Sequence, residues 1–410
     1  MILFIFNYTT MNKKLIIFAA TGLMLAACSN DKVTEVSKSY EAANTISFRT
    51  TVNGQTRAAQ DANTILATEG ATFNVTAFNT GTNTSPYINN ITYTRNGSGT
   101  FSSTEYYYWP ASGNLDFYAY SPIDGASSQV SSSDNWKTFT ITPTVDGTSE
   151  VAGTHVDFVY ASVDNKGRAD GANGLPLNFR HTGAKVALKV THTNSNAAKQ
   201  IYFKVKAWAV GYLDKSGTFT FVDKTDATNY VNTTGSGLLP VGYWSNNDSW
   251  ATDKQVYRST ALTSGNEIIV AAVAGTPTSA VTTHTFAEEM ILVPQGSITA
   301  VSAYEAKTAN SKPNGSYVAV QLAIYNKSND ILIQDYTWAM WPVAINWAPG
   351  KKYTYNVNLD DGGYFETNLN GSDTDNTNLD PVLAGAIIKF ATVTVDEWTT
   401  ENVNATAVTP

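Results

Sequence analysis

The feature that most constrains the fold of this 410-residue chain is a two-residue alternation of apolar and polar side chains, which recurs along most of its length. Residues 45–53 show the pattern, because Ile46, Phe48 and Val52 fall on one face of an extended chain and Arg49 on the other. Gly, Asn and Pro separate such stretches, and no long segment has apolar residues at helical spacing. The sequence therefore predicts an all-β protein of antiparallel β-sandwiches.

Length and one polar segment predict two domains. A chain of this size can bury two cores. Residues 164–174 are polar, rich in Gly and without an apolar period, which is typical of a linker. We expect an N-terminal sandwich over residues 45–170 and a C-terminal sandwich over residues 171–410.

The start of the chain has the pattern of an export signal. Lys13 and Lys14 precede an apolar stretch, residues 15–25, which is too short to span a bilayer permanently. It ends in Leu25-Ala26-Ala27-Cys28, the pattern of a lipobox, in which a signal peptidase cuts before a cysteine that carries diacylglycerol. The alternative, a buried thiol after an ordinary signal peptide, leaves an exported chain with one odd cysteine. We expect lipid attachment at Cys28, which anchors the protein at a membrane without a transmembrane helix.

This interpretation assigns residues 1–28 to the signal peptide. Met11 is the expected true start, because an apolar patch precedes it where the basic region should begin. Residues 29–44 are polar and of mixed charge, and they predict a tether between the lipid and the folded body.

Composition and motifs argue against several classes of function. The net charge of -8 disfavours a nucleic-acid partner, which would need a basic surface. The four histidines show no His-Glu-x-x-His spacing, no Gly-x-Ser-x-Gly is present, and the single cysteine is assigned to lipid. Residues 373–378 resemble a calcium loop, but Asn378 stands where that loop needs glycine. We expect no enzymatic activity, no metal and no cofactor.

Two aromatic groups are candidate sugar-stacking surfaces. The first comprises residues 106–109 with Tyr118 and Tyr120, and strand alternation places about half of such residues in a core. The second, Tyr243, Trp244 and Trp250, lies in a loop-like stretch and supplies the candidate glycan contacts. They support an alternative function, a surface glycan-binding lipoprotein of a nutrient-uptake system.

Several motifs, in order along the chain, carry a family resemblance. They are Ile46-Ser47-Phe48 with Thr56-Arg57-Ala58, Tyr108-Trp109-Pro110, residues 115–122, Leu177-Asn178-Phe179-Arg180-His181, Ile291-Leu292-Val293-Pro294-Gln295, residues 347–357 and Val393-Thr394-Val395-Asp396-Glu397-Trp398. Together they resemble the fimbrillin family of Bacteroidales, lipoprotein precursors of type V pilus subunits. The resemblance implies two tandem transthyretin-like β-sandwich domains and a place in fimbriae at the cell outer membrane. It implies other pilus subunits as partners, in homo- or hetero-polymers, and an adhesion ligand on a host or bacterial surface.

The resemblance also implies assembly by strand exchange. A trypsin-like protease cleaves after an arginine, the first strand is lost, and a neighbour's C-terminal strand fills the groove. Here Ile46, Phe48 and Val52 would be the core residues of the exchangeable strand. Arg57 is the expected cleavage site rather than Arg49, because Arg49 lies inside the strand, where a protease cannot bind its backbone. The alternative is that Arg57 is a solvated turn residue and the first strand is permanent.

The donor strand is expected at the C-terminus. Val393 and Val395, then Val403, Ala405 and Ala407, alternate as a groove would require. The alternative is that residues 393–398 simply close the second domain and the residues beyond them fray.

Overall fold

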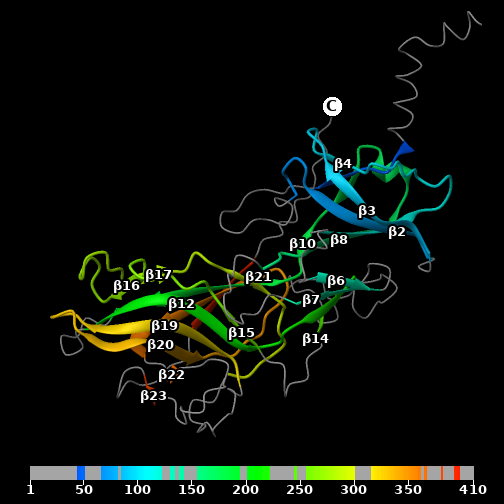
Figure 1. The fold of residues 1–410 in the computed structure, drawn as a ribbon. Helices are drawn as coiled ribbons and strands as arrows, with labels where there is room; N and C mark the ends of the chain where they lie inside the picture. Colours follow the sequence, from blue (N-terminus) through cyan, green and yellow to red (C-terminus); the bar gives the residue numbers. More distant parts are fainter. Residues whose placement is uncertain are drawn as a thin grey trace, which may run out of the picture.

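In the part of the chain that the structure describes, the regular elements are almost all β-strands, and these form four sheets. The all-β prediction is confirmed. The structure, a computed structural model, describes residues 44–50, 66–81, 85–121, 130–133, 138–142, 155–193, 201–221, 244–246, 255–300, 315–361, 364–366, 380–381 and 392–397. Figure 1 shows two lobes arranged along an elongated molecule. Two short 3-10 helices accompany the described strands, η2 (Arg168–Gly171) and η6 (Leu359–Asp361).

The first lobe is one eight-stranded sheet in the order β10-β8-β5-β2-β3-β4-β1-β9. Its strands are β1 (Phe48–Thr50), β2 (Thr72–Asn79), β3 (Pro86–Arg95), β4 (Thr100–Ser102), β5 (Leu115–Ser121), β8 (Val159–Lys166), β9 (Leu175–Leu177) and β10 (Arg180–His181). Strands β9 and β10 are the two edge strands of this sheet, yet only Asn178 and Phe179 separate them in sequence. The sheet must therefore curl until its edges approach each other, around a core to which strands from β1 to β9 contribute.

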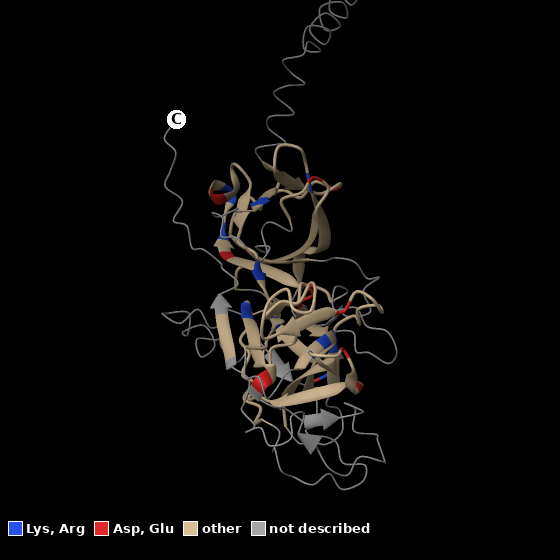
Figure 2. Ribbon diagram, turned by 90° about the vertical axis from the view of Figure 1, so that its left-hand side faces the viewer, with Lys and Arg blue, Asp and Glu red and all other residues tan. Residues whose placement is uncertain are grey.

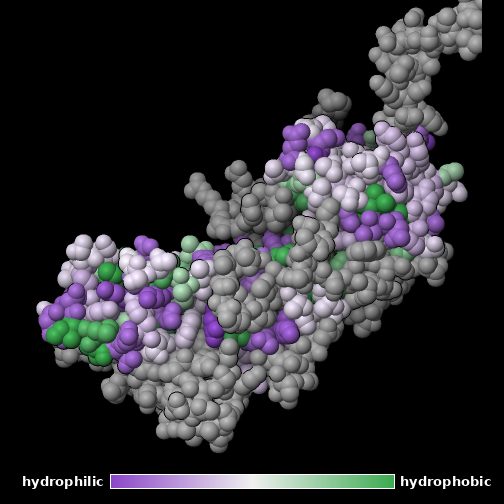
Figure 3. Space-filling model, viewed as in Figure 1, coloured by the Kyte–Doolittle hydropathy of each residue, from purple (hydrophilic) through white to green (hydrophobic). Residues whose placement is uncertain are grey.

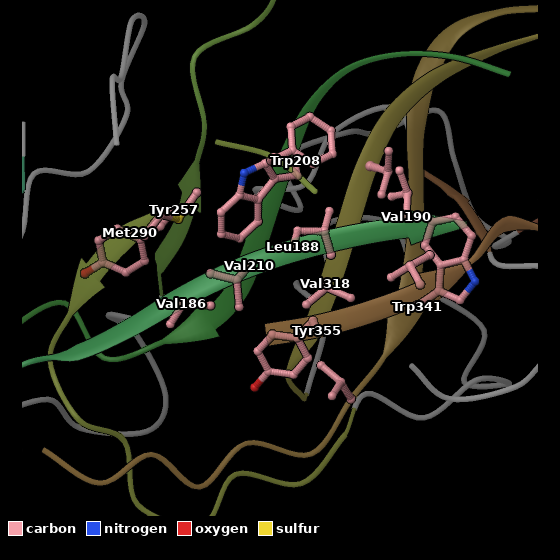
Figure 4. Close-up of a cluster of buried hydrophobic side chains, with 14 of the residues drawn as sticks. Val186, Leu188, Val190, Trp208, Val210, Tyr257, Met290, Val318, Trp341 and Tyr355 are labelled. Carbon is pink, nitrogen blue, oxygen red and sulfur yellow. The ribbon is translucent and has the colours of Figure 1, made fainter. Parts of the chain in front are cut away.

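The second lobe contains two sheets that enclose one core. The five-stranded sheet consists of β11 (Ala184–Thr191), β17 (Thr283–Thr285), β18 (Met290–Leu292), β21 (Lys351–Asn358) and β24 (Thr392–Glu397). The seven-stranded sheet consists of β12 (Ile201–Leu213), β15 (Gln255–Arg258), β16 (Ile268–Ala271), β19 (Tyr317–Asn326), β20 (Leu332–Pro342), β22 (Tyr364–Glu366) and β23 (Asp380–Pro381). Figure 4 shows Val186, Leu188 and Val190 of β11 on the same cluster as Trp208 and Val210 of β12. The two sheets therefore pack face to face.

The strands of the second lobe follow the alternation in the sequence. In β21, Tyr353, Tyr355 and Val357 are buried, and the residues between them are partly exposed. Most strand pairs are antiparallel, but β1 pairs with β9, and β11 with β21, in parallel. Both differ from the antiparallel expectation because they join strands far apart in sequence, where no hairpin sets the direction.

A four-stranded sheet lies between the lobes. It consists of β6 (Val130–Ser133), β7 (Thr138–Ile141), β13 (Gly217–Thr220) and β14 (Trp244–Asn246), in the order β14-β13-β7-β6. It thus combines strands from both sides of residue 170. The first-lobe sheet also extends past that residue, because β9 and β10 are two of its strands, and the chain leaves it after His181.

Candidate functional site

The candidate site is the position of β1 inside the first-lobe sheet. On one side, Phe48 pairs antiparallel with Phe101 of β4. On the other, it pairs in parallel with Leu175 of β9. Just before β1, the Ile46 N–H donates to the Tyr107 carbonyl at 2.6 Å, and the Trp109 N–H donates to the Asn44 carbonyl at 3.0 Å. The segment 44–50 therefore lies in a slot with a described chain segment on each side.

The side chain of Phe48 fills the centre of the first-lobe core. It is 0% exposed, and its ring meets the rings of Phe73, Tyr93 and Phe117 edge-on at centroid distances of 5.9, 4.7 and 5.5 Å. Ile46 is buried in the same cluster. Two of the three core residues expected for an exchangeable strand thus face the core, and the third, Val52, lies outside the described residues.

The exposed face of β1 carries Arg49. Its Nε donates to the Gly174 carbonyl at 3.2 Å, across the turn that leads into β9. Gly174 has a φ of +82°, and a Cβ there would lie 3.3 Å from the carbonyl carbon of Phe48. A glycine is therefore required for β9 to approach β1 so closely. Arg49 lies within a paired strand, whereas Arg57 and Cys28 lie outside the described residues.

The structure divides the first aromatic group of the sequence. Trp109, Tyr118 and Tyr120 are buried, so they belong to cores. Tyr106 and Tyr108 are exposed. Tyr87 of β3 joins them, because its hydroxyl donates to the Tyr108 carbonyl at 2.7 Å. Sequence reasoning missed Tyr87. The antiparallel pairing of β3 with β4, which sets Thr94 opposite Ser102, runs the chain after β4 back along β3 toward Tyr87.

The second aromatic group receives little structural description. Tyr243 and Trp250 lie outside the described residues, and Trp244 is the first residue of β14, with its side chain outside the described set. These three candidate glycan contacts stay predictions.

The C-terminal strand β24 is an edge strand of the five-stranded sheet. It pairs antiparallel with β21, with Val393 opposite Tyr355 and Val395 opposite Tyr353. Opposed residues of an antiparallel pair share a face, so both valines lie on the side of the core. They are nevertheless exposed, Val395 by 53%. This is the position that the closing-strand alternative expects, and residues 398–410 lie outside the described set.

Two histidines have separate structural partners. His181 Nδ1 lies 2.8 Å from Asp157 Oδ1, and His192 Nδ1 contacts the carboxylate of Asp360. Among the described side chains, no group of three or more His, Cys, Asp or Glu residues is placed to hold a metal ion. In the same part of the chain, no helix is long and apolar enough to cross a membrane. Figure 2 shows the described charged residues scattered over both lobes.

Comparison with known proteins identifies the family. A fimbrial protein from Bacteroides vulgatus matches with 12% identity and a TM-score of 0.49, covering 87% of this chain and 100% of its own. A fimbrilin from Porphyromonas gingivalis matches with 11% identity and a TM-score of 0.36, covering 88% of this chain and 98% of its own. No match was found among curated proteins. The family model described as fimbrillin-like matches residues 56–376. Because this match covers well over half of its residues, the chain belongs to the fimbrillin-like family.

Proposed function

We propose that this protein is a structural and adhesive subunit of cell-surface fimbriae, exported as a lipoprotein and assembled by strand exchange, without enzymatic activity. Family membership supports the fimbrial role. The observation that carries strand exchange is the place of β1, a three-residue strand at the start of the described chain whose Phe48 lies in the core between two neighbouring strands.

Cleavage after Arg57 would separate all of β1 from the body of the protein. The segment 44–50 would then be held only by hydrogen bonds to its neighbours and by the burial of Ile46 and Phe48. Its departure would leave β4 and β9 with unpaired backbone edges, which are the template for adding a strand. Only a strand with apolar residues at alternate positions fills such a slot, because the pockets of Ile46 and Phe48 lie on one face.

The donor is a C-terminal strand of another subunit. If β24 stays on β21, as it lies in the single chain, the donor must come from residues 399–410, where Val403, Ala405 and Ala407 alternate. If β24 leaves, the exposed Val393 and Val395 add two apolar side chains to the donor.

The two lobes are proposed to be the tandem transthyretin-like domains of the family. Their separate cores support this division, and the end of the first-lobe sheet supports a boundary after His181.

Lipid at Cys28 would hold the precursor at the outer membrane through the tether of residues 29–44.

N-terminal sequencing of the surface-exposed protein tests the processing step. We expect a chain that begins at Ala58, and a chain that keeps β1 in the Arg57→Ala variant. Arg49→Ala is the matched control, and it should be processed normally because Arg49 lies in a paired strand. Assembled fimbriae whose subunits still begin at Cys28 would contradict the proposal.

Truncation tests the donor. A chain from Ala58 to Pro410 should form ladders that resist sodium dodecyl sulfate, because strand insertion pairs the main chain along its length and dissociates slowly. A chain from Ala58 to Thr399 should stay monomeric if residues beyond 399 are the donor. Equal ladders from both would assign the donor to β24 or to another segment.

A further inference from the structure

Strand β1 contains a second arginine, at a position that pairing protects from proteolysis. Arg49 is the middle residue of β1, and its side chain is exposed. Its backbone is enclosed, because Arg49 lies opposite Thr100 of β4 on one side and opposite Pro176 of β9 on the other. Proteases bind the main chain of a substrate in extended form, much as a sheet binds an added strand. A segment with a neighbour on both sides has no free edge for such binding.

Side-chain contacts hold Arg49 in this paired position. Its Nε donates to the Gly174 carbonyl at 3.2 Å, and the residue before it, Phe48, is fully buried in the first-lobe core. Figure 3 shows mainly hydrophilic and near-neutral residues on the described surface of the first lobe, at the upper right, which agrees with a slot that β1 fills. In the intact chain, Arg49 is therefore protected although its side chain faces solvent.

Cleavage after Arg57 would end this protection. In the intact chain an opened β1 recloses readily, because both of its ends are held, whereas after the cut the segment 44–50 keeps only noncovalent contacts to the body. Proteolysis of a paired site follows the population of its open form, which the cut raises. We propose that the same arginine-specific protease then cuts a second time, between Arg49 and Thr50. This step rests on the proposed function, because the first cut releases the strand.

The second cut is a hydrolysis that makes the departure of β1 difficult to reverse. Water adds across the peptide bond, which leaves a carboxylate on Arg49 and an ammonium group on Thr50. In the intact strand Thr50 lies opposite Leu177 of β9, so its loss removes part of the pairing, and the new carboxylate resists burial beside β9. A segment that ends at Arg49 should rebind the slot at least roughly tenfold more weakly than one that ends at Arg57. The slot then stays open for the donor strand.

Arg95 of β3 is an internal control for this argument. Its N–H donates to the Ala71 carbonyl at 2.8 Å, and its carbonyl accepts from the Gly70 N–H at 3.1 Å. On its other side it lies opposite Phe101 of β4. Its backbone is thus enclosed like that of Arg49, but a cut after Arg57 does not release β3. We expect the protease to leave Arg95 intact.

Mass spectrometry of the fragments tests the second cut. The full precursor with Cys28→Ser is incubated with an arginine-specific endoprotease, and its fragments are followed over time. We expect a body that begins at Ala58, and then the free peptide of residues 50–57. Arg49→Gln should leave the body unchanged and abolish this peptide. A body that begins at Ala58, with a released segment that stays intact through Arg57, would overturn the second cut and leave the proposed function standing.

The Arg57→Ala variant tests the order of the two cuts. Because β1 then stays attached to the body, the chain should not be cut after Arg49. A body that begins at Thr50 in this variant would overturn the proposal, since Arg49 would be accessible within the sheet. If the wild type is not cut after Arg57 at all, the proposed function is contradicted, and the protection of Arg49 is decided by loosening β1 directly.

The double variant Phe48→Ala with Arg57→Ala loosens β1 without the first cut. Loss of the buried ring raises the open population, so a chain that begins at Thr50 should appear at least roughly tenfold faster than in Arg57→Ala alone. Cleavage after Arg95 at the same rate would report unfolding of the whole lobe, and Ile46→Ala, which removes a smaller buried side chain, then replaces Phe48→Ala. An unchanged rate after Arg49 in both backgrounds would overturn the proposal that pairing of β1 controls this site.

Discussion

The replacement Phe48→Ala measures how strongly β1 is held. Phe48 is fully buried, and three aromatic rings contact it edge-on. Removing a buried phenylalanine side chain costs about 3–5 kcal/mol of unfolding free energy, because apolar burial is lost and a cavity stays behind. The total free energy of unfolding of a domain is only about 5–15 kcal/mol, so the first lobe should lose a large part of its stability.

The control for this replacement lies one residue away. Arg49→Ala removes an exposed side chain of the same strand and one hydrogen bond to the Gly174 carbonyl, so it should cost about 0.5–1.5 kcal/mol. Urea unfolding of both variants gives the midpoint and the slope, and an unchanged slope shows that the loss is one of stability. Hydrogen exchange should place the loss in the first lobe, since Phe48 contributes to that core only.

One result would refute this reasoning. If Phe48→Ala costs no more than Arg49→Ala, the contacts of Phe48 contribute little and β1 is not integral to the first core. The proposal that the loss of β1 leaves a slot that only an alternating apolar strand can fill would then have no physical basis.

Two further predictions concern the same lobe. Gly174→Ala should lower the free energy of unfolding by about 1–3 kcal/mol, because Gly174 has a φ of +82° and a Cβ there would lie close to the carbonyl carbon of Phe48. The control is Gly113→Ala, which should cost less because Gly113 has a similar φ of +85° but open space around it. Equal losses of stability in thermal unfolding would contradict the close approach of Gly174 to Phe48. Burial raises the pKa of Tyr120 to about 12, although hydrogen bonds with Asn74 and Asn90 lower it, and burial also raises the pKa of Tyr93. The folded state therefore keeps tyrosine protons that the unfolded state releases, so the free energy of unfolding should be highest below pH 10 and fall as the pH rises from 10 toward 12. Urea unfolding at each pH should show a smaller fall for Tyr120→Phe than for the wild type. An equal fall in both would contradict the assignment to Tyr120.

Local alternation made much of the fold predictable. In β21 the alternation of Tyr353, Tyr355 and Val357 with polar residues matches the observed burial, and the same pattern places Ile46 and Phe48 on the core side of the first strand. In β5, Phe117 and Tyr118 lie on opposite faces, as any two successive strand residues do, but both faces are buried, which alternation alone does not indicate. That burial depends on the four-stranded sheet, which assembles strands distant in sequence.

Long-range pairing was the part that the sequence did not reveal. Residues 164–174 contain the end of β8, the helix η2 and the turn into β9, and all of them except the buried Gly171 and Gly174 are exposed or partly exposed. The polar pattern predicts exposure correctly, but exposure alone does not distinguish a linker from a turn that returns to the same sheet. The parallel pairing of β1 with β9 has no local signal, so only the structure shows that the first strand has a neighbour on both sides.

The two faces of the first sheet are arranged so that the proposed exchange of its first strand would not separate the lobes. The face toward β1 carries Phe117 and the core around Phe48. The opposite face carries Tyr118 and Tyr120, which pack with Phe139 of β7 and Phe219 of β13 in an aromatic cluster that also includes Val293, directly after β18 of the second lobe. The junction between the lobes is thus built on the face that β1 does not touch. Loss of β1 would disturb the core around Phe48 and leave the aromatic cluster in place. A subunit without β1 would therefore keep the relative position of its lobes until a new strand fills the slot.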